Sequence, residues 1–189
     1  MPKAIAMVKK IPLTFACLLL TPLFVAAQKS VSELPSTHAS ALQEFLTKHS
    51  ELQFLSEREM DKEILKDMRK NFGARLTPYY RTGDFNRDGI QDFVMILAKE
   101  GPPSEDAGSE IAETHRYRHD ITIVIFNGQK RGGFRPAFVK NTTAPLVCFL
   151  YGTYEKKKRL YFAVYETDEH FIMSPAGKGY IVEFEPDED

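Results

Sequence analysis

The chain has 189 residues, with 25 basic and 26 acidic side chains and a formal net charge of −1. Its composition, 43% hydrophobic and 27% charged, is typical of a folded globular protein and excludes a fibrous or largely disordered one. The first 27 residues carry three lysines and no acid, so the remaining 162 residues have a net charge of −4. This acidic balance argues against nucleic acid as a partner, because phosphate-backbone binding needs a concentrated basic surface.

The first 27 residues have the pattern of a secretory signal peptide. Lys3, Lys9 and Lys10 give a positive start, residues 11–26 are almost entirely apolar, and small residues lead up to Ala27. This pattern predicts cleavage after Ala27. The alternative, a transmembrane anchor, needs about 20 apolar residues, and this run is shorter and contains prolines. We therefore expect an exported protein, periplasmic or secreted, with no integral membrane anchor after cleavage.

The cleaved chain, residues 28–189, is expected to form one domain. Its only cysteine, Cys148, lies in an apolar run. A single thiol forms no internal disulfide, and we expect Cys148 to be a buried strand residue that packs as a small hydrophobe.

The N-terminal part of this domain is predicted to be helical. After a flexible start at residues 28–36, residues 37–73 carry helical spacings, with one apolar face formed by Leu42, Phe45, Leu46 and His49. Ser56 and Glu59 have the spacing of a capping box, which predicts the start of a second helix. Gly73 is expected to end that helix.

From residue 78 to residue 184 the pattern changes to short segments rich in β-branched and aromatic residues. Eight strands are predicted, at residues 79–81, 93–98, 121–126, 134–139, 146–151, 160–165, 171–173 and 180–184. Turn residues such as Asn127 and Gly128 are expected to separate them, and the polar stretch 99–118 is expected to be a mobile loop.

Helices that precede a run of strands predict an α+β domain. We expect an N-terminal helical hairpin packed on one mostly antiparallel, strongly twisted β-sheet of about six to eight strands. An acidic tail, residues 185–189, follows the last strand.

One segment, residues 83–93, carries a recognisable metal-binding pattern. Ca²⁺ is a hard cation that takes six to eight oxygen ligands, and this loop places oxygen-bearing side chains at its positions 1, 3, 5 and 9. Gly89 allows the sharp turn after position 5. The pattern predicts a Ca²⁺ site whose ligands are Asp84, Asn86, Asp88, Asp92 and the carbonyl of Ile90. The alternative is a hairpin turn rich in Asp, Asn and Gly that holds no metal.

The loop differs from an EF-hand, because position 12 is Met95 where that loop needs a bidentate Glu. Residues 79–98 resemble instead the short calcium loop of FG-GAP repeats, Asp-x-Asn/Asp-x-Asp-Gly-x-x-Asp, found in integrin-type propeller blades and in many secreted bacterial proteins. The resemblance implies a loop that joins two antiparallel strands and binds Ca²⁺ through Asp84, Asn86, Asp88 and Asp92. Because this chain has a single such segment, the resemblance applies to the loop and not to a propeller fold.

Three other features have weaker functional readings. His115 and His119 are four residues apart and would share a metal on a helix, but the apolar run that follows favours a loop or strand edge. The basic run 156–159 is expected to be a solvated hairpin tip, with contact to an anionic surface as the alternative. Asn141 begins a glycosylation acceptor sequence that matters only in a host that glycosylates exported proteins.

Two functional hypotheses follow from these patterns. The first is an exported non-enzymatic domain with one structural Ca²⁺, which binds or scaffolds a protein or an envelope or extracellular ligand. The alternative is a cell-envelope hydrolase or an enzyme inhibitor that uses a cleft beside the 99–118 loop. No Gly-x-Ser-x-Gly elbow or other nucleophile motif occurs, and no catalytic residue is predicted. A convergent pair of buried titratable side chains would favour the enzyme.

Overall fold

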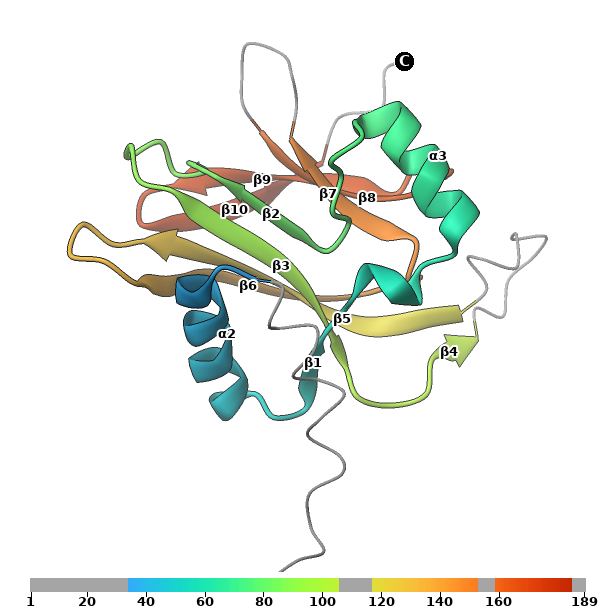
Figure 1. Ribbon diagram of the computed structural model, residues 1–189, viewed down its shortest axis with the longest axis horizontal. Helices are drawn as coiled ribbons and strands as arrows, with labels where there is room; N and C mark the ends of the chain where they lie inside the picture. Colours follow the sequence, from blue (N-terminus) through green and yellow to red (C-terminus); the bar gives the residue numbers. More distant parts are fainter. Residues whose placement is uncertain (1–33, 106–116, 153–158, 185–189) are drawn as a thin grey trace, which may run out of the picture.

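A computed structural model describes residues 34–105, 117–152 and 159–184 of the chain. These residues form two antiparallel β-sheets that pack face to face, with one helix on the outer side of each sheet (Figure 1). Their elements, in chain order, are α2 (Ser36–Lys48), β1 (Leu52–Phe54), the 3₁₀ helix η1 (Glu57–Glu59), α3 (Lys62–Phe72), β2 (Tyr80–Gly83), β3 (Asp92–Lys99), β4 (Ser104–Glu105), β5 (Tyr117–Gly128), β6 (Phe134–Ala144), β7 (Cys148–Gly152), β8 (Leu160–Val164), β9 (His170–Ala176) and β10 (Gly179–Glu183).

The first sheet is built around β3 and β5, which pair antiparallel with each other. The outer side of β3 pairs with β2 at residues 92–95 and with β1 at residues 97–99. The other side of β5 pairs with β6 along most of its length, and the two-residue β4 pairs with the start of β5. The sheet therefore has six strands, of which β4 is a short extension.

The second sheet contains the four remaining strands in the order β10-β9-β8-β7, each antiparallel to its neighbour. Each strand follows its neighbour in the chain, as expected for a meander of hairpins. The Lys140 ammonium of β6 lies 5.2 Å from the ring centre of Phe171 in β9, so Phe171 marks the face of this sheet that is turned toward the first sheet.

β3 explains why the first sheet is covered on both faces. Its residues from Asp92 to Ala98 are all buried, so both of its alternating sets of side chains need a packing layer. Val94 and Ile96 belong to the large core between the sheets. Phe93 and Met95 point the other way and form a second core with α2.

Helix α2 covers that second core through residues at helical spacing. His38, Leu42 and Phe45 are its buried residues. The Phe45 ring meets Phe126 edge to face, with ring centres 5.7 Å apart. The apolar face predicted for the first helix is therefore confirmed at Leu42 and Phe45.

Helix α3 lies against the second sheet, on the side away from the first (Figure 1). The register pairs Leu150 with Phe162 and Phe162 with Phe171, so these three side chains share the inner face, and Phe149 points outward. The ring of Phe72 in α3 contacts Phe149 with centres 4.7 Å apart. The four layers are thus α2, the first sheet, the second sheet and α3.

The expected fold class was wrong in its architecture. An N-terminal helical hairpin on one sheet of six to eight strands was predicted, but the structure is mostly β, with two sheets. The two helices do not form a hairpin, because the segment between them contains β1, which pairs with β3. The physical reason is that β3 and β5 are apolar on both faces, and such a sheet is covered by two layers rather than by one pair of helices.

All eight predicted strands are present, with shifted ends, whereas β1 and β4 were missed. The second helix begins later than the capping box predicted. Ser56 accepts a hydrogen bond from the Arg58 N–H and caps η1, while Asp61 accepts from Glu63 and Ile64 and caps α3. Gly73 ends α3, as predicted.

Asn127 and Gly128 were expected to form a turn, but they are the last residues of β5. Several predictions lie outside the described residues: the signal peptide, the flexible start up to residue 33, most of the 99–118 loop, His115, residues 156–158 of the basic run and the acidic tail.

Candidate functional site

The predicted metal loop, residues 84–91, connects β2 to β3. Two of its residues have left-handed backbone angles, Arg87 with φ 64° and Gly89 with φ 83°. The Phe85 ring packs over Gly83 just before the loop, so that a Cβ at Gly83 would lie 2.7 Å from the ring and the ring would have to move. The loop therefore turns sharply back on itself between the antiparallel strands β2 and β3.

The exposed part of the loop gathers three of the predicted ligands around one turn. The Asp88 N–H donates to Asp84 Oδ1 and to Asn86 Oδ1, each at 3.0 Å. The Gly89 N–H donates to Asp84 Oδ2 at 3.0 Å, and Asn86 Nδ2 donates to Asp88 Oδ2 at 3.1 Å. Asp84, Asn86 and Asp88 are thus brought together by local hydrogen bonds.

Ile90 and Asp92 occupy different surroundings from those three residues. The Ile90 N–H donates to Asp88 Oδ1 at 2.9 Å, which continues the turn toward β3. Asp92 is fully buried as the first residue of β3. Its Oδ2 accepts hydrogen bonds from the N–H groups of Phe85 (2.9 Å) and Asn86 (3.3 Å), and its Oδ1 accepts from Gly128 (2.9 Å).

The Asp92 carboxylate therefore ties the loop to the end of β5. Burial raises the pKa of Asp92 above its ordinary value, while the three N–H donors act in the opposite direction and the negative charge of Asp88 raises it further. Gly128 is required at this contact, because a Cβ there would lie 2.4 Å from the Gln91 carbonyl oxygen. The sequence did not reveal this role of Gly128, since Asn-Gly is a common turn signal.

A tyrosine from the second sheet reaches the same region. The Tyr180 hydroxyl in β10 donates to Asn127 Oδ1 at 2.8 Å in a buried hydrogen bond. The pKa of Tyr180 is raised, first by burial and then by the negative charges of Asp92, Asp88 and Asp84. The end of β5 is thus linked to the loop through Gly128 and to the second sheet through Asn127. Tyr180 was predicted only as a strand residue.

The oxygen atoms that the loop offers are of the kind that a hard cation such as Ca²⁺ prefers as ligands. Two carboxylates and an amide oxygen stand at the surface, and no ion pair of the described residues involves Asp84, Asp88 or Asp92. Asp92 adds a third carboxylate, whose oxygens accept three backbone hydrogen bonds. The described residues contain no cluster of three His, Cys, Asp or Glu side chains already arranged for a metal ion.

A groove of about 660 Å³ lies on the α2 side of the first sheet, beside the start of the 99–118 segment. Thr122 donates from its hydroxyl to Asn141 Oδ1 at 3.0 Å on its floor. Two ion pairs lie at its rim: Lys99 with Asp120 at 3.9 Å, and His49 with Glu51 at 3.7 Å, if His49 is protonated. All four of these side chains are between 41% and 63% exposed, so the described lining contains no buried titratable pair of the kind that an enzyme would use.

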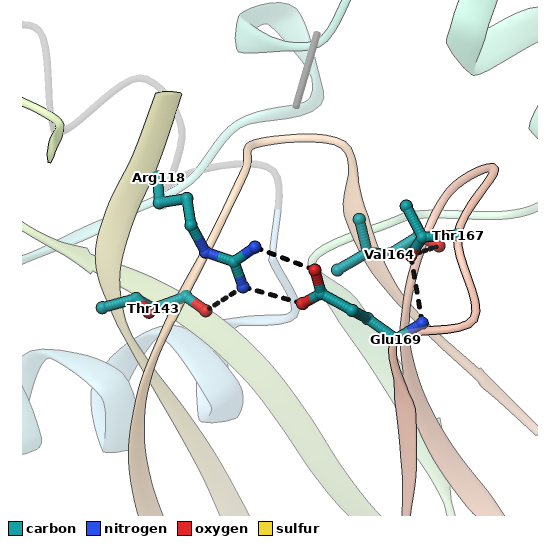
Figure 2. Close-up of polar contacts among 5 residues, drawn as sticks. All are labelled: Arg118, Thr143, Val164, Thr167 and Glu169. Atoms are coloured by element: carbon teal, nitrogen blue, oxygen red, sulfur yellow. Dashed lines mark hydrogen bonds and ion pairs between the residues drawn. The ribbon is translucent and has the colours of Figure 1, made fainter. Parts of the chain in front are cut away.

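A bidentate ion pair joins the two sheets at the other end of β5 (Figure 2). Arg118 Nη1 and Nη2 donate to the two carboxylate oxygens of Glu169 at 2.8 and 2.7 Å, and Nη2 also donates to the Thr143 carbonyl at 3.0 Å. Glu169 is held in the turn before β9 by its own N–H, which donates to Thr167 Oγ1. Figure 2 shows Arg118 reaching across from β5 to this turn. The ion pair between Arg118 and Glu169 therefore connects the two sheets and is assigned no role in binding or catalysis.

Neither His119 nor Cys148 forms a functional site in the described structure. His119 lies in strand β5, whereas a metal shared with His115 would need both residues on a helix; His115 is outside the described residues. Cys148 is fully buried in β7, and burial raises the pKa of its thiol to about 12, so it is unreactive.

No protein-family model, no curated protein and no solved structure matches the chain. Among the described residues, no helix is both long enough and apolar enough to cross a membrane.

Proposed function

We propose that the protein is an exported, non-enzymatic binding module whose β2–β3 loop holds one structural Ca²⁺. The observation that carries this proposal is the loop itself, in which Asp84, Asn86 and Asp88 gather around a single turn without any ion pair to a described basic residue. Two like charges held close together repel each other, and a divalent cation between them removes that repulsion.

In this proposal the side chains of Asp84, Asn86 and Asp88 hold the ion from the exposed side. Asp92 contributes a carboxylate oxygen from the buried side, and the Ile90 carbonyl completes the protein ligands. The ion neutralises the loop and fixes its shape. Because Asp92 also accepts from the Gly128 N–H, a rigid loop in turn fixes the end of β5.

The proposed compartment is consistent with a modest affinity. Extracellular calcium modules typically bind at about 10⁻⁴–10⁻³ M, so an exported protein would hold its ion without a very tight site. The signal-peptide pattern of residues 1–27 supports export. Mass spectrometry of protein recovered from the periplasm or the medium should give a chain that begins at Gln28.

The test is thermal unfolding with about 10 mM Ca²⁺ and with a chelator. This concentration is about 100 times a dissociation constant of about 10⁻⁴ M, so the native state should gain about 2.7 kcal/mol. For a domain of this size that corresponds to a rise in Tm of about 5–10 °C. Asp88→Ala should abolish the rise, whereas Asp168→Ala, which removes an exposed acid from a turn of the second sheet, should retain it. An equal Tm with and without Ca²⁺ in the unaltered protein would show that the loop is an acidic turn that does not bind Ca²⁺.

The groove is the surface that one alternative would use, a module that inhibits or hydrolyses envelope material. Asp120 and Glu51 are the carboxylates of its lining, and each is exposed and paired with a cation, Asp120 with Lys99 and Glu51 with His49 when that histidine is protonated. Release of soluble fragments from purified cell-wall material, lost in Asp120→Asn but not in Asp168→Ala, would favour the hydrolase over the binding module.

A further inference from the structure

Strand β6 is an edge strand along its whole length of 11 residues. One side pairs with β5, and in the described part of the chain its other side pairs with no strand. An edge strand presents N–H and C=O groups to which another extended chain can pair. Pro136 and a bulge opposite Phe126 interrupt the early part of the strand, so Phe138 to Thr143 form the regular edge.

The side chains along this edge are cationic in an otherwise acidic protein. Residues 127–144 contain no Asp or Glu. The start of β10 lies beside the edge, since a Cβ on Gly179 would be 3.4 Å from the Ala137 carbonyl oxygen. None of the basic residues here forms an ion pair among the described residues; they are Lys130, Arg131, Arg135, Lys140 and Lys178.

The alternation of β6 places two of these charges on one face. Arg135 pairs with Asn127, whose side chain receives the Tyr180 hydroxyl, so Arg135 lies on the side of the second sheet. Lys140 lies on the same side, over the Phe171 ring. Val139 and Asn141 point to the other side, toward the groove.

The positive charges on β6 determine which kind of strand can pair with its free edge. Two copies of β6 paired with each other would bring cations against cations, and like charges on neighbouring strands are destabilising. A strand with carboxylates at alternate positions meets Arg135 and Lys140 with opposite charge, while small polar residues between them face Val139 and Asn141. Repulsion of one partner and attraction of the other together give specificity.

We propose that β6 binds an acidic, extended segment of another protein, which adds to the first sheet as a further strand. Backbone hydrogen bonds to the edge would supply affinity, and the alternating carboxylates would select the partner, as in other cases of strand addition. This proposal does not depend on calcium binding by the β2–β3 loop.

The test uses the purified protein and a blocked eight-residue peptide of alternating Glu and Thr, at low and high salt. Saturable binding at millimolar peptide or below is expected, together with slower amide hydrogen exchange in β6 at residues 138–143. A peptide of the same sequence with N-methylated threonines has the same charge but fewer backbone donors. It should lose both the binding and the exchange protection.

Charge variants test the second half of the proposal. Arg135→Glu with Lys140→Glu should weaken binding by about tenfold or more, because two attractive cross-strand pairs become repulsive. Since Lys140 also lies over Phe171, Arg135→Glu with Lys178→Glu serves as a second variant, with a smaller loss expected. The matched control is Lys62→Glu with Lys66→Glu on α3, which makes the same change in net charge and should bind as the unaltered protein does.

Three outcomes would overturn the proposal. They are no saturable binding of the Glu-Thr peptide, equal binding of the N-methylated peptide, and equal or tighter binding of an acidic polysaccharide such as polygalacturonate. The last two would show that the edge attracts any polyanion through its charge alone.

Discussion

The two ends of β5 are fastened in different ways. At the Gly128 end, a fully buried carboxylate, Asp92, accepts backbone hydrogen bonds from the loop and from β5. At the Arg118 end, the link is an ion pair whose side chains are 20% and 49% exposed. Water can replace a lost hydrogen-bond partner only where it has access. Removal of a carboxylate should therefore lower the free energy of unfolding strongly at the Asp92 end and only modestly at the Arg118 end.

Removal of the Asp92 carboxylate should have the largest effect on stability. Asp92→Ala would leave the N–H groups of Phe85, Asn86 and Gly128 without their acceptor; the Gly128 contact is buried and the other two are partly buried. Each buried unsatisfied group costs about 1–3 kcal/mol, so we expect a loss of about 3–5 kcal/mol in the free energy of unfolding, measured by urea titration in the presence of chelator. Asp84→Ala, at the exposed part of the same loop, should cost about 1 kcal/mol or less. Similar losses in the two variants would contradict the distinction.

The close approach of the loop to β5 gives the second prediction. Gly128→Ala would place a Cβ 2.4 Å from the Gln91 carbonyl oxygen and 2.6 Å from Ile90 Cγ2, and backbone must shift to admit it. We expect a loss of about 1–3 kcal/mol in the free energy of unfolding. Gly152→Ala is the matched control, because its nearest neighbour there, the Arg159 carbonyl oxygen, is at 3.6 Å. Its stability should change by about 0.5 kcal/mol or less.

The same contrast shows which parts of the structure could be read from the sequence. The loop was visible because its residues interact locally: Asp84 bonds to Asp88 and Gly89, which are four and five residues away. The strands were visible because their apolar side chains are consecutive. By contrast, Asp92 meets Gly128 across 36 residues, and no local pattern indicates that contact.

The division into two sheets was hidden for a related reason. Both faces of β3 are apolar, and a continuous apolar run does not say whether a helix or a second sheet covers each face. The segment Leu52–Phe54 could be read as part of a helical region, because three residues are too few to show the period of a strand. Its pairing with β3 is again a non-local contact.

The third prediction concerns the exposed end of β5. In a double-mutant cycle with Arg118→Ala and Glu169→Ala, the coupling energy should be about 1 kcal/mol. The bidentate geometry and the partial burial of Arg118 place it above the exposed pair Lys66–Glu63, for which we expect about 0.3 kcal/mol. The Arg118 coupling should fall at high salt, since exposed charges are screened. A coupling of several kcal/mol that is insensitive to salt would mean that this end is as dry as the Asp92 end.

The smallest expected effect concerns pH at the buried end. His38 of α2 is 5% exposed, stacks on Phe93 with ring centres 4.4 Å apart, and shares a 2.6 Å hydrogen bond between its Nδ1 and the Tyr80 hydroxyl. Burial lowers the pKa of His38 below its ordinary value of 6.5, so the folded state disfavours the imidazolium. The unfolded chain then binds more protons as the pH falls below 6.5, and stability should fall with it. His119 has a pKa lowered by burial as well and contributes with the same sign.

His38→Leu tests the contribution of His38 protonation to this pH dependence, because leucine fills the site beside Phe93 but cannot be protonated. Between pH 7.5 and pH 5 the free energy of unfolding of the unaltered protein should fall more steeply than that of His38→Leu, measured by urea titration. His49→Leu is the control, since it removes a histidine whose side chain is 41% exposed. An equal pH dependence in His38→Leu and in the unaltered protein would show that water reaches His38. The Gly128 end of β5 would then be less dry than the buried Asp92 carboxylate implies, and the expected cost of Asp92→Ala would have to be lowered accordingly.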